Sequence, residues 1–198
     1  EHHAILSDLI RRHLGYVNIL RNQLRGQKTD ASIQGWLTES DAALVRDARN
    51  QATMLLTRQT EVLGELCDQD KFEQFRLFEL MATIKDLGSL QGGAERIMNT
   101  PLMRHYSWFT TLFVWVFLLL LPFCFLDLGW RMIPLVVVVS AMFIMLDRSG
   151  TFTETPFSYD FNSVPLDTIC RTIEVDLLQQ IGETELPEPI SPKNGVLM

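Results

Sequence analysis

The sequence predicts an all-α membrane protein with cytosolic amphipathic helices and one transmembrane helical hairpin. Apolar residues recur at helical spacing on both sides of two long uncharged stretches, and a short link joins those stretches. The predicted parts are a cytosolic helical region (1–104), the transmembrane hairpin (105–147), a cytosolic connector with an amphipathic helix (148–182) and an extended or disordered tail (183–198).

Composition narrows the classes of function. The 198 residues are 47% hydrophobic and 21% charged, which is enough apolar material for a folded core. The formal net charge is −7, so no basic excess is available to neutralise a phosphate backbone, and nucleic acid is not an expected partner. Cys67, Cys124 and Cys170 lack the paired spacing of a zinc site and cannot form a complete disulfide set, which favours a reducing compartment.

Two amphipathic helices are predicted at the start of the chain. Between Ala4 and Arg25, apolar residues recur every three or four positions and charged residues occupy the other faces. After a turn-rich segment, a helix begins near Thr38 or Ser40, because either hydroxyl can accept a hydrogen bond from the first helical turn. This second helix is expected to continue to about Leu66.

A third helix is predicted over residues 71–90, and the pair Gly92–Gly93 is expected to end it. Phe72, Phe75 and Phe78 recur on it every three positions. Aromatic residues at this spacing are typical of a packed core, whereas in a ring of identical chains they would line a narrow pathway. The residues alone leave both interpretations open.

Two apolar stretches predict the hairpin. Residues 108–126 contain no charge, and as a helix they would span roughly 28 Å, close to the thickness of a bilayer's hydrocarbon core. Residues 132–146 form a shorter second span that needs extension back to Leu128 to cross. Because the link Asp127–Arg131 is too short for a domain, we expect antiparallel neighbours, with Trp130 as an interfacial anchor.

Flanking charges predict the orientation of the hairpin. Arg96 and Arg104 precede the first span and Arg148 follows the second, against Arg131 alone in the link. The positive-inside rule therefore places both termini of this chain in the cytoplasm, with the hairpin in the inner membrane. Because the sequence lacks an initiator Met and a secretory signal, we expect the C-terminal part of a longer protein.

The region after the hairpin combines a connector with one more helix. Residues 150–162 are rich in Thr, Pro and aromatic residues without helical periodicity, which indicates an ordered connector. A helix is predicted over residues 166–181, with Pro165 at its start and Gly182 just beyond its end. Three prolines and few apolar residues predict an extended or disordered tail over residues 183–198.

Polar clusters give little support for catalysis or metal binding. We interpret the histidines as a solvated terminal group, and the acids after the hairpin as helix caps and solvated faces in preference to a site that attracts cations. Neither group matches the spacing of a metal site, so no metal, cofactor or catalytic residue is expected. The residues concerned are His2, His3, His13, Glu154, Asp160, Asp167, Glu174 and Asp176.

Four segments resemble the bestrophin-like channels of bacteria. They are LQGGAERIMNTPL (90–102), LLLLPF (118–123), ETPF (154–157) and NSVPLDTICRTIEVDLL (162–178), and the resemblance covers about residues 14–182. It implies a homopentameric ion channel with four membrane helices per subunit, large cytosolic helical regions and both termini inside. This chain would then lack the first two membrane helices, including the hydrophobic neck of the pore.

The resemblance also suggests site residues. By its position before the glycine pair, Phe75 resembles the residue at the cytosolic constriction of the family. A ring of five Phe side chains in this chain would restrict ions through unfavourable dehydration. In animal bestrophins a run of acids follows Pro-Phe-Gly and binds calcium, whereas here Ser158 and a single nearby acid follow, so calcium gating is not expected. The candidate connector and inter-subunit contacts are Glu154, Pro156, Phe157 and Asp160.

The expected function is passive flux of small inorganic ions, chloride or monovalent cations, through a homopentamer that contacts membrane lipids. A membrane-anchored interaction protein, whose hairpin only anchors or oligomerises it, is the alternative, and conductance distinguishes the two. A metal- or lipid-modifying membrane enzyme would need convergent polar ligands that the sequence does not display. The sequence does not decide between anions and cations.

Overall fold

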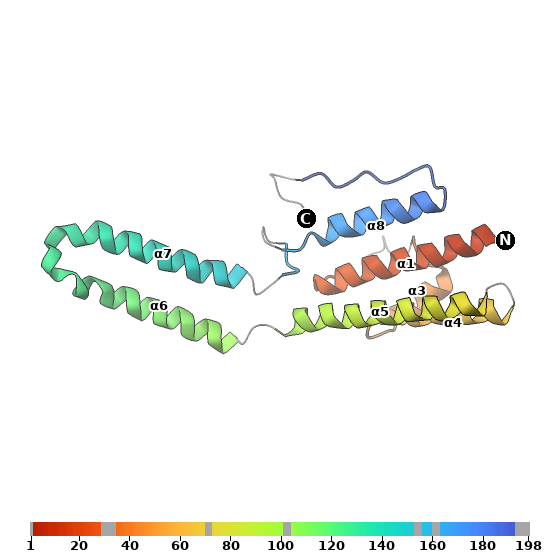
Figure 1. Ribbon diagram of the computed structural model, residues 1–198, viewed down its shortest axis with the longest axis horizontal. Coiled ribbons are helices and arrows are strands. Elements are labelled where there is room, and N and C mark those ends of the chain that lie inside the picture. The colour runs from red at the N-terminus through yellow and green to blue at the C-terminus, as the bar shows by residue number, and fades with distance from the viewer. Residues whose placement is uncertain are drawn as a thin grey trace. The chain divides into compact units, whose positions relative to one another are not determined.

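The computed structural model is all-helical, which confirms the predicted fold class (Figure 1). The residues form two compact units, one from Glu1–Arg96 with Pro165–Met198 and the other from Ile97–Val164. The four-part division expected from the sequence, with its assignment to compartments, stays a prediction. The structure describes residues 2–28, 35–69, 73–100, 104–152, 156–159 and 163–192.

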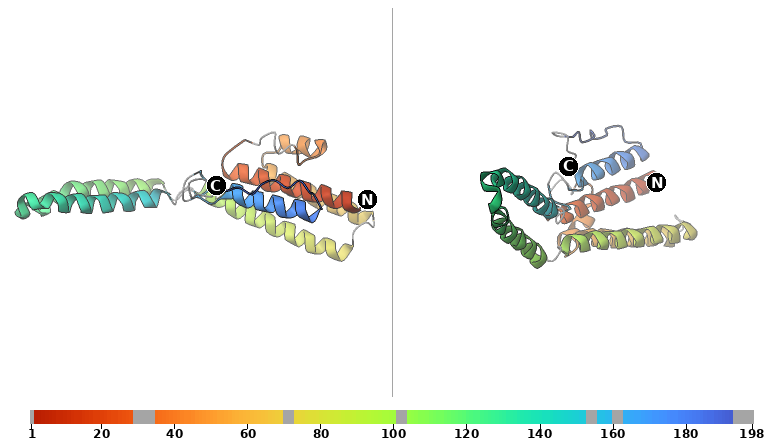
Figure 2. Two further views of the ribbon diagram at one scale, coloured as in Figure 1. Left: turned by 90° about the horizontal axis from the view of Figure 1, so that it is seen from above. Right: turned by 60° about the vertical axis from the view of Figure 1, so that its left-hand side comes forward.

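Helix α1 (His2–Leu24) is the central element of the first unit, and it confirms the amphipathic helix predicted over residues 4–25. It packs against α4 (Gln51–Asp68) and α8 (Leu166–Gln180), and α8 runs beside it in all three views (Figures 1 and 2). Burial of its apolar face on both neighbours forms two adjoining cores. The buried members are Leu14, Tyr16, Ile19, Val45, Ala52, Leu55, Leu56, Leu178 and Ile181.

The second predicted helix is divided in two. Helix α3 (Glu39–Arg46) begins as expected at Thr38, whose Oγ1 accepts a hydrogen bond from the Asp41 backbone N–H at 3.3 Å. The chain then breaks, and α4 begins where Asn50 Oδ1 accepts a hydrogen bond from the Thr53 N–H at 3.1 Å. A continuous helix from 38 to 66 was therefore wrong, because the Asn50 side chain satisfies the backbone of a new first turn.

Helix α5 (Gln74–Asn99) continues through the glycine pair that was expected to end it. Glycine inside a helix costs about 1 kcal/mol relative to alanine, so other contacts must hold this segment helical. Gln91 Nε2 donates to Thr53 Oγ1 at 2.9 Å, and Asn50 Nδ2 donates to Glu95 Oε1 at 2.9 Å. These bonds to α4 fix the turns on either side of the pair, which a local pattern does not reveal.

The second unit contains the predicted hairpin. Helices α6 (Arg104–Cys124) and α7 (Met132–Phe152) are joined by the 3₁₀ helix η1 (Leu126–Arg131), in which Gly129 has a φ of 58°. The Phe117 and Phe143 rings lie 4.8 Å apart between their centroids, so they are one point at which the two helices pack together. Helix α7 continues six residues past the predicted end at Leu146, into the segment expected to be a connector.

The last helix follows the sequence closely. Helix α8 begins after Pro165 and ends just before Gly182, whose φ of 80° suits a residue without a Cβ. Hydrogen bonds at both ends join it to α1 in an antiparallel arrangement, from His3 Nε2 to the Ile181 carbonyl at 3.0 Å and from Arg25 to Asp167 at 2.6 Å. Residues 183–192 contain neither helix nor strand.

Candidate functional site

The first turns of α5 expose two large aromatic side chains. Phe75 is 76% exposed and Phe78 is 66% exposed, whereas Ile84 and Leu87 on the same helix pack against the core. Within the described chain, Phe75 and Phe78 are not core residues, so the interpretation of these aromatic residues as part of a packed core is wrong for both. Phe72 lies outside the described residues. The assignment of Phe75 to an ion constriction stays a prediction.

A polar cluster fixes which side of α5 faces the core. Gln91 is 4% exposed and donates from Nε2 to Glu95 Oε1 at 2.7 Å as well as to Thr53 on α4. At 3.6 residues per turn, Phe75 and Gln91 lie about 160° apart around the helix axis. The same bonds that bury Gln91 therefore turn Phe75 away from the core.

The connector contacts are only partly described. Pro156 and Phe157 are half-buried, and the Pro156 carbonyl accepts a hydrogen bond from the Val164 N–H at 2.8 Å. Glu154 and Asp160 lie outside the described residues. The contact of this segment with a neighbouring subunit thus stays a prediction.

A buried charge network that was not predicted from the sequence joins α1, α3 and α4. Asp41, with a side chain 1% exposed, accepts a hydrogen bond from Arg12 Nε at 2.8 Å, and Arg58 Nε lies 3.5 Å from its other oxygen. Arg12 also donates to Asp8 at 2.8 Å. A hydrogen bond to Glu61 is the main cause that raises the pKa of Arg58, so this guanidinium stays charged.

The acids after the hairpin include one member of a second ion-pair group. Asp167 lies 2.6 Å from Arg25 and 3.4 Å from Arg21, and the Arg25 side chain is 1% exposed. The interpretation of Asp167 as a solvated residue is therefore wrong, because α8 places its carboxylate beside two cations of α1. Glu174 pairs with Arg171 at 3.2 Å on its own helix, and Asp176 is exposed as expected.

Replacement of Asp167 by Ala is expected to lower the free energy of unfolding by about 2–3 kcal/mol, because it removes the carboxylate from a buried guanidinium. Asp176→Ala on the same helix removes an exposed carboxylate and should change stability by less than about 0.5 kcal/mol. Thermal unfolding followed by circular dichroism measures both. Equal shifts for the two variants would contradict an anchoring role for Asp167.

Of the predicted solvated histidines, His3 is exposed as expected, His13 is not, and the side chain of His2 lies outside the described part of the chain. His13 is half-buried with its ring 5.6 Å from that of Tyr16, and burial lowers its pKa. His3 bonds to the end of α8, as described above. Among the residues that the structure describes, no three His, Cys, Asp or Glu side chains gather in a way that could hold a metal ion.

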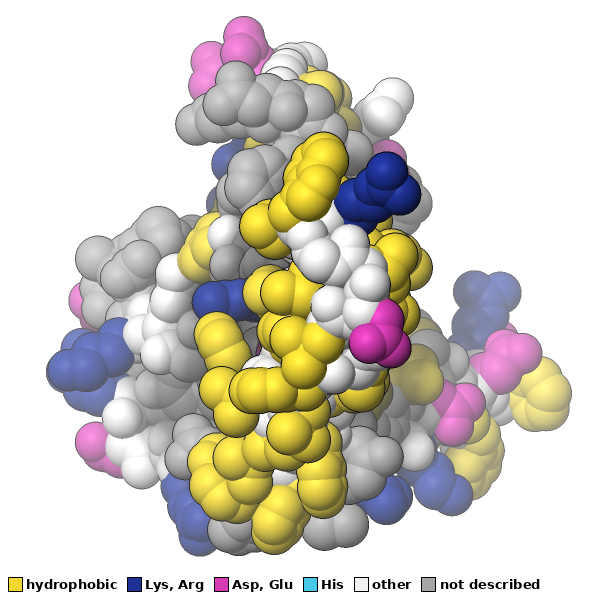
Figure 3. Space-filling model, turned by 90° about the vertical axis from the view of Figure 1, so that its left-hand side faces the viewer, with side chains coloured by type: hydrophobic (Ala, Val, Ile, Leu, Met, Phe, Trp, Pro, Cys, Tyr) yellow, Lys and Arg dark blue, Asp and Glu magenta, His cyan; other side chains and the backbone are white. Residues whose placement is uncertain are grey.

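The hairpin has the surface of a lipid-facing element. In Figure 3, apolar side chains cover most of the hairpin surface that faces the viewer. Leu126–Ser149 is long and apolar enough to cross a membrane, and none of its most apolar 18-residue stretch is buried. Trp108–Cys124 is a shorter apolar helix. Inside the hairpin, Thr111 Oγ1 donates to Asp147 at 3.2 Å, so the acid in α7 has a partner from α6.

An all-helical chain with this exposed apolar hairpin has the architecture of a membrane protein, and the comparisons give its family. Residues 1–179 match the family described as bacterial/fungal bestrophin protein. The chain therefore belongs to the bestrophin family, which confirms the resemblance inferred from its four segments.

Individual relatives agree with this assignment. The voltage-dependent anion channel-forming protein YneE of Salmonella typhi is 30% identical over 92% of this chain, and YneE of Escherichia coli is 30% identical over 96%. A crystal structure of a bacterial bestrophin homologue variant from Klebsiella pneumoniae has a TM-score of 0.86 and 25% identity, covering 91% of this chain and 68% of its own. The chain spans 60% of the length of the Salmonella relative and 62% of the Escherichia relative.

Proposed function

We propose that this chain is part of a homopentameric channel subunit that carries small inorganic anions passively across the bacterial inner membrane. The observation that carries the proposal is the sequence similarity of this chain to proteins named voltage-dependent anion channel-forming. The similarity extends over more than nine-tenths of the chain. Those names favour anions over the cations that the sequence left open, and chloride is the anion to test. The proposal assigns transport and not catalysis to the chain.

The hairpin is proposed to cross the membrane twice. Helices α6 and α7 have 21 residues each, and at about 1.5 Å per residue each would span about 31 Å, similar to the hydrocarbon core. Exposed side chains such as Phe113 and Met145 would contact lipid. The arginines that flank the hairpin would then hold both ends of this chain in the cytoplasm.

Helix α5 is proposed to line the cytosolic part of the pathway. Five copies around an axis would bring five Phe75 side chains together, which gives a use to an aromatic residue that is 76% exposed in the single chain. A ring of aromatic side chains would oppose ion passage because it offers few groups to replace the hydration shell. Membrane lipids, the other subunits and the permeant ion are the proposed partners.

Ion flux tests this proposal. The complete gene product, reconstituted into liposomes loaded with chloride, is expected to release chloride faster than protein-free liposomes, and reversal potentials in a salt gradient should favour chloride over potassium. Its native mass should correspond to five subunits. A folded oligomer without flux would contradict the channel and favour the membrane-anchored interaction protein, while selectivity for potassium would contradict the anion assignment alone.

A further inference from the structure

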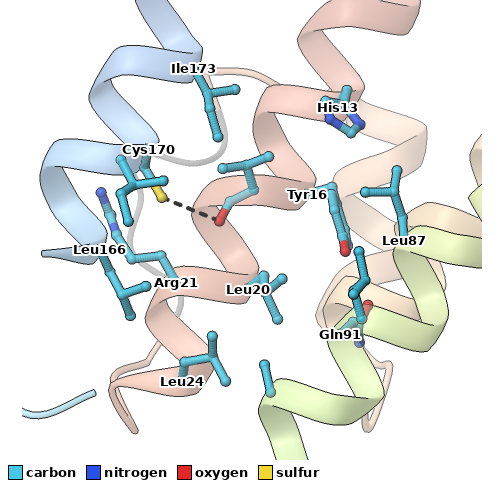
Figure 4. A pocket seen from close by; sticks show the side chains of 14 residues that line it. His13, Tyr16, Leu20, Arg21, Leu24, Leu87, Gln91, Leu166, Cys170 and Ile173 are labelled. Atoms are coloured by element: carbon cyan, nitrogen blue, oxygen red, sulfur yellow. Dashed lines mark hydrogen bonds between the residues drawn. The ribbon is translucent and has the colours of Figure 1, made fainter. Parts of the chain in front are cut away.

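Contacts within the first unit fix the inward face of helix α5. Ile84 and Leu87 pack against the core. Leu87, Gln91 and Ala94 also line a cavity of about 290 Å³ between α1, α5 and α8, whose walls are mostly apolar (Figure 4). The residues on the opposite face of α5, from Phe75 to Gly93, are exposed in the single chain. That opposite face is therefore available to the surroundings of the chain.

Two acids lie on the opposite face of α5, close to the line of Phe75. At 3.6 residues per turn, Asp86 lies about 20° from Phe75 around the helix axis and Glu79 about 40° from it. Gln91, on the inward face, lies about 140° from Asp86. At about 1.5 Å per residue, Asp86 is also roughly 16 Å further along α5, toward the end that continues to α6. Both carboxylates are therefore placed on the same strip of the helix as Phe75.

The other residues of this strip have small side chains. Ala82, Ser89 and Gly93 lie within about 40° of Phe75 around the helix axis, and all three are exposed. Nothing lies within 4 Å of the position that a Cβ of Gly93 would occupy. The centre of a protein–protein interface usually carries large apolar side chains, and the strip has none between Phe75 and Gly93. Its composition is typical of a surface in contact with water.

Large apolar side chains lie on both sides of the strip. Phe78 is 66% exposed and Leu90 is 72% exposed, and they lie about 60° from Phe75 in opposite directions around the helix. In a closed ring of identical subunits, a helix that faces the axis has one neighbour on each side. Phe78 and Leu90 are placed to contact those neighbours, and the strip between them then faces the axis.

The two acids of the strip keep their negative charge without a nearby cation. In the described part of the chain, neither Glu79 nor Asp86 has an ion-pair partner, and Arg76 pairs with Glu73 at 3.3 Å. Lys85 is next to Asp86 in sequence but lies about 100° away around the helix. Charges of one sign that line a narrow space concentrate ions of the opposite sign and deplete ions of the same sign.

We propose that Asp86, together with Glu79, is a selectivity-determining residue of the ion pathway, whose negative charge lowers the permeability of anions relative to cations. This role rests on the proposed function, because it requires copies of α5 around a pathway. It acts through the electrostatic potential and needs no bound cation. The direction of the effect is the same whichever ion the complete channel prefers, because other parts of the protein also contribute to that preference.

Reversal potentials in a potassium chloride gradient test this role with the complete protein in planar bilayers. Asp86→Asn is expected to raise the ratio of chloride to potassium permeability about twofold or more at about 0.1 M salt. The increase should shrink at about 1 M salt, where the Debye length is only about 3 Å. The double variant Glu79→Gln/Asp86→Asn should raise the ratio further, because it removes both charges of the strip.

Two matched variants separate the position of the charge from its presence. Asp86→Glu keeps the charge at the same site, so its permeability ratio should equal that of the wild type. Asp176→Asn removes the same charge from an exposed position on α8 and should also leave the ratio unchanged. Because Asp86 is exposed and unpaired in the described chain, its substitution should not impair folding of the subunit.

Three results would overturn the role of Asp86. One is a conducting channel whose permeability ratio is unchanged in Asp86→Asn and in the double variant. Another is an equal change in Asp176→Asn, which would mean that the total charge of the protein matters and the strip does not. The third is loss of the native oligomer in Asp86→Asn with an unchanged ratio, the result expected for an ion pair between subunits. A wild-type oligomer without flux would instead contradict the proposed function itself.

Discussion

Replacement of Asp41 by Ala is expected to lower the free energy of unfolding by about 3–5 kcal/mol, the cost of leaving a buried charge without its partner. The Asp41 side chain is 1% exposed and its carboxylate lies within 2.8 Å of Arg12, whose own side chain is 5% exposed. After the substitution, Asp8 would be the one acid still paired with Arg12 among the described residues, and it is 44% exposed and binds Arg12 through a different nitrogen. Because this network joins α1 to α3 and α4, its loss should loosen the whole first unit.

Thermal unfolding of purified Asp41→Ala measures this effect against an exposed ion pair. Glu73→Ala removes the partner of Arg76 from a pair whose side chains are 69% and 72% exposed, so it should cost less than about 1 kcal/mol. Replacement of both Asp41 and Arg12 by apolar residues of similar size should recover much of the loss, since no buried charge is then left alone. A small, equal effect of Asp41→Ala and Glu73→Ala would show that the network is not an anchor.

The sequence predicts those elements whose causes are local. The periodic apolar residues of α1 and α8, the cap at Thr38 and the left-handed Gly182 all act within a few positions of one another. The hairpin is also local, because its length and lack of charge are properties of continuous segments. The four segments that resemble the bestrophin-like channels are also continuous in sequence, so they could be recognised without a structure.

The errors arise where distant residues decide the local structure. Asn50 looks like any polar residue inside a helical pattern, but it caps α4 and also bonds to Glu95, 45 positions away. The pair Gly92–Gly93 is typical of a helix end, but contacts of the flanking turns with α4 keep α5 continuous. The bond to Glu95 and the contacts with α4 are absent from a pattern read along the chain. That pattern therefore misses the break before α4 and predicts a helix end at the glycine pair.

The cavity between α1, α5 and α8 has the same origin. Gln91 lies on α5, Tyr16 on α1 and Cys170 on α8, so no motif brings them together in the sequence. Only the packing of α5 and α8 on α1 brings these residues around one apolar space. By contrast, Phe75 was chosen from the sequence because a family motif fixes its distance to the glycine pair, and the structure adds its exposure.

Replacement of Phe75 by Ala is expected to raise the chloride conductance of the complete channel by a factor on the order of two or more. If five Phe75 side chains face one axis, the substitution widens the apolar ring that they form and lets the ion keep more of its hydration shell. Unfolding should change little, because Phe75 is 76% exposed and a cost of about 3–5 kcal/mol applies only to a buried phenylalanine.

Single-channel recording in planar bilayers measures this change, with Phe113→Ala as the matched control. Phe113 is 68% exposed on α6, where the proposed surroundings are lipid, so its removal should leave conductance unchanged. A Phe75→Ala channel with unchanged conductance and unchanged selectivity would exclude Phe75 from the pathway. If its melting temperature fell steeply as well, Phe75 would be a packing residue between subunits, since the described chain by itself gives the ring no core to stabilise.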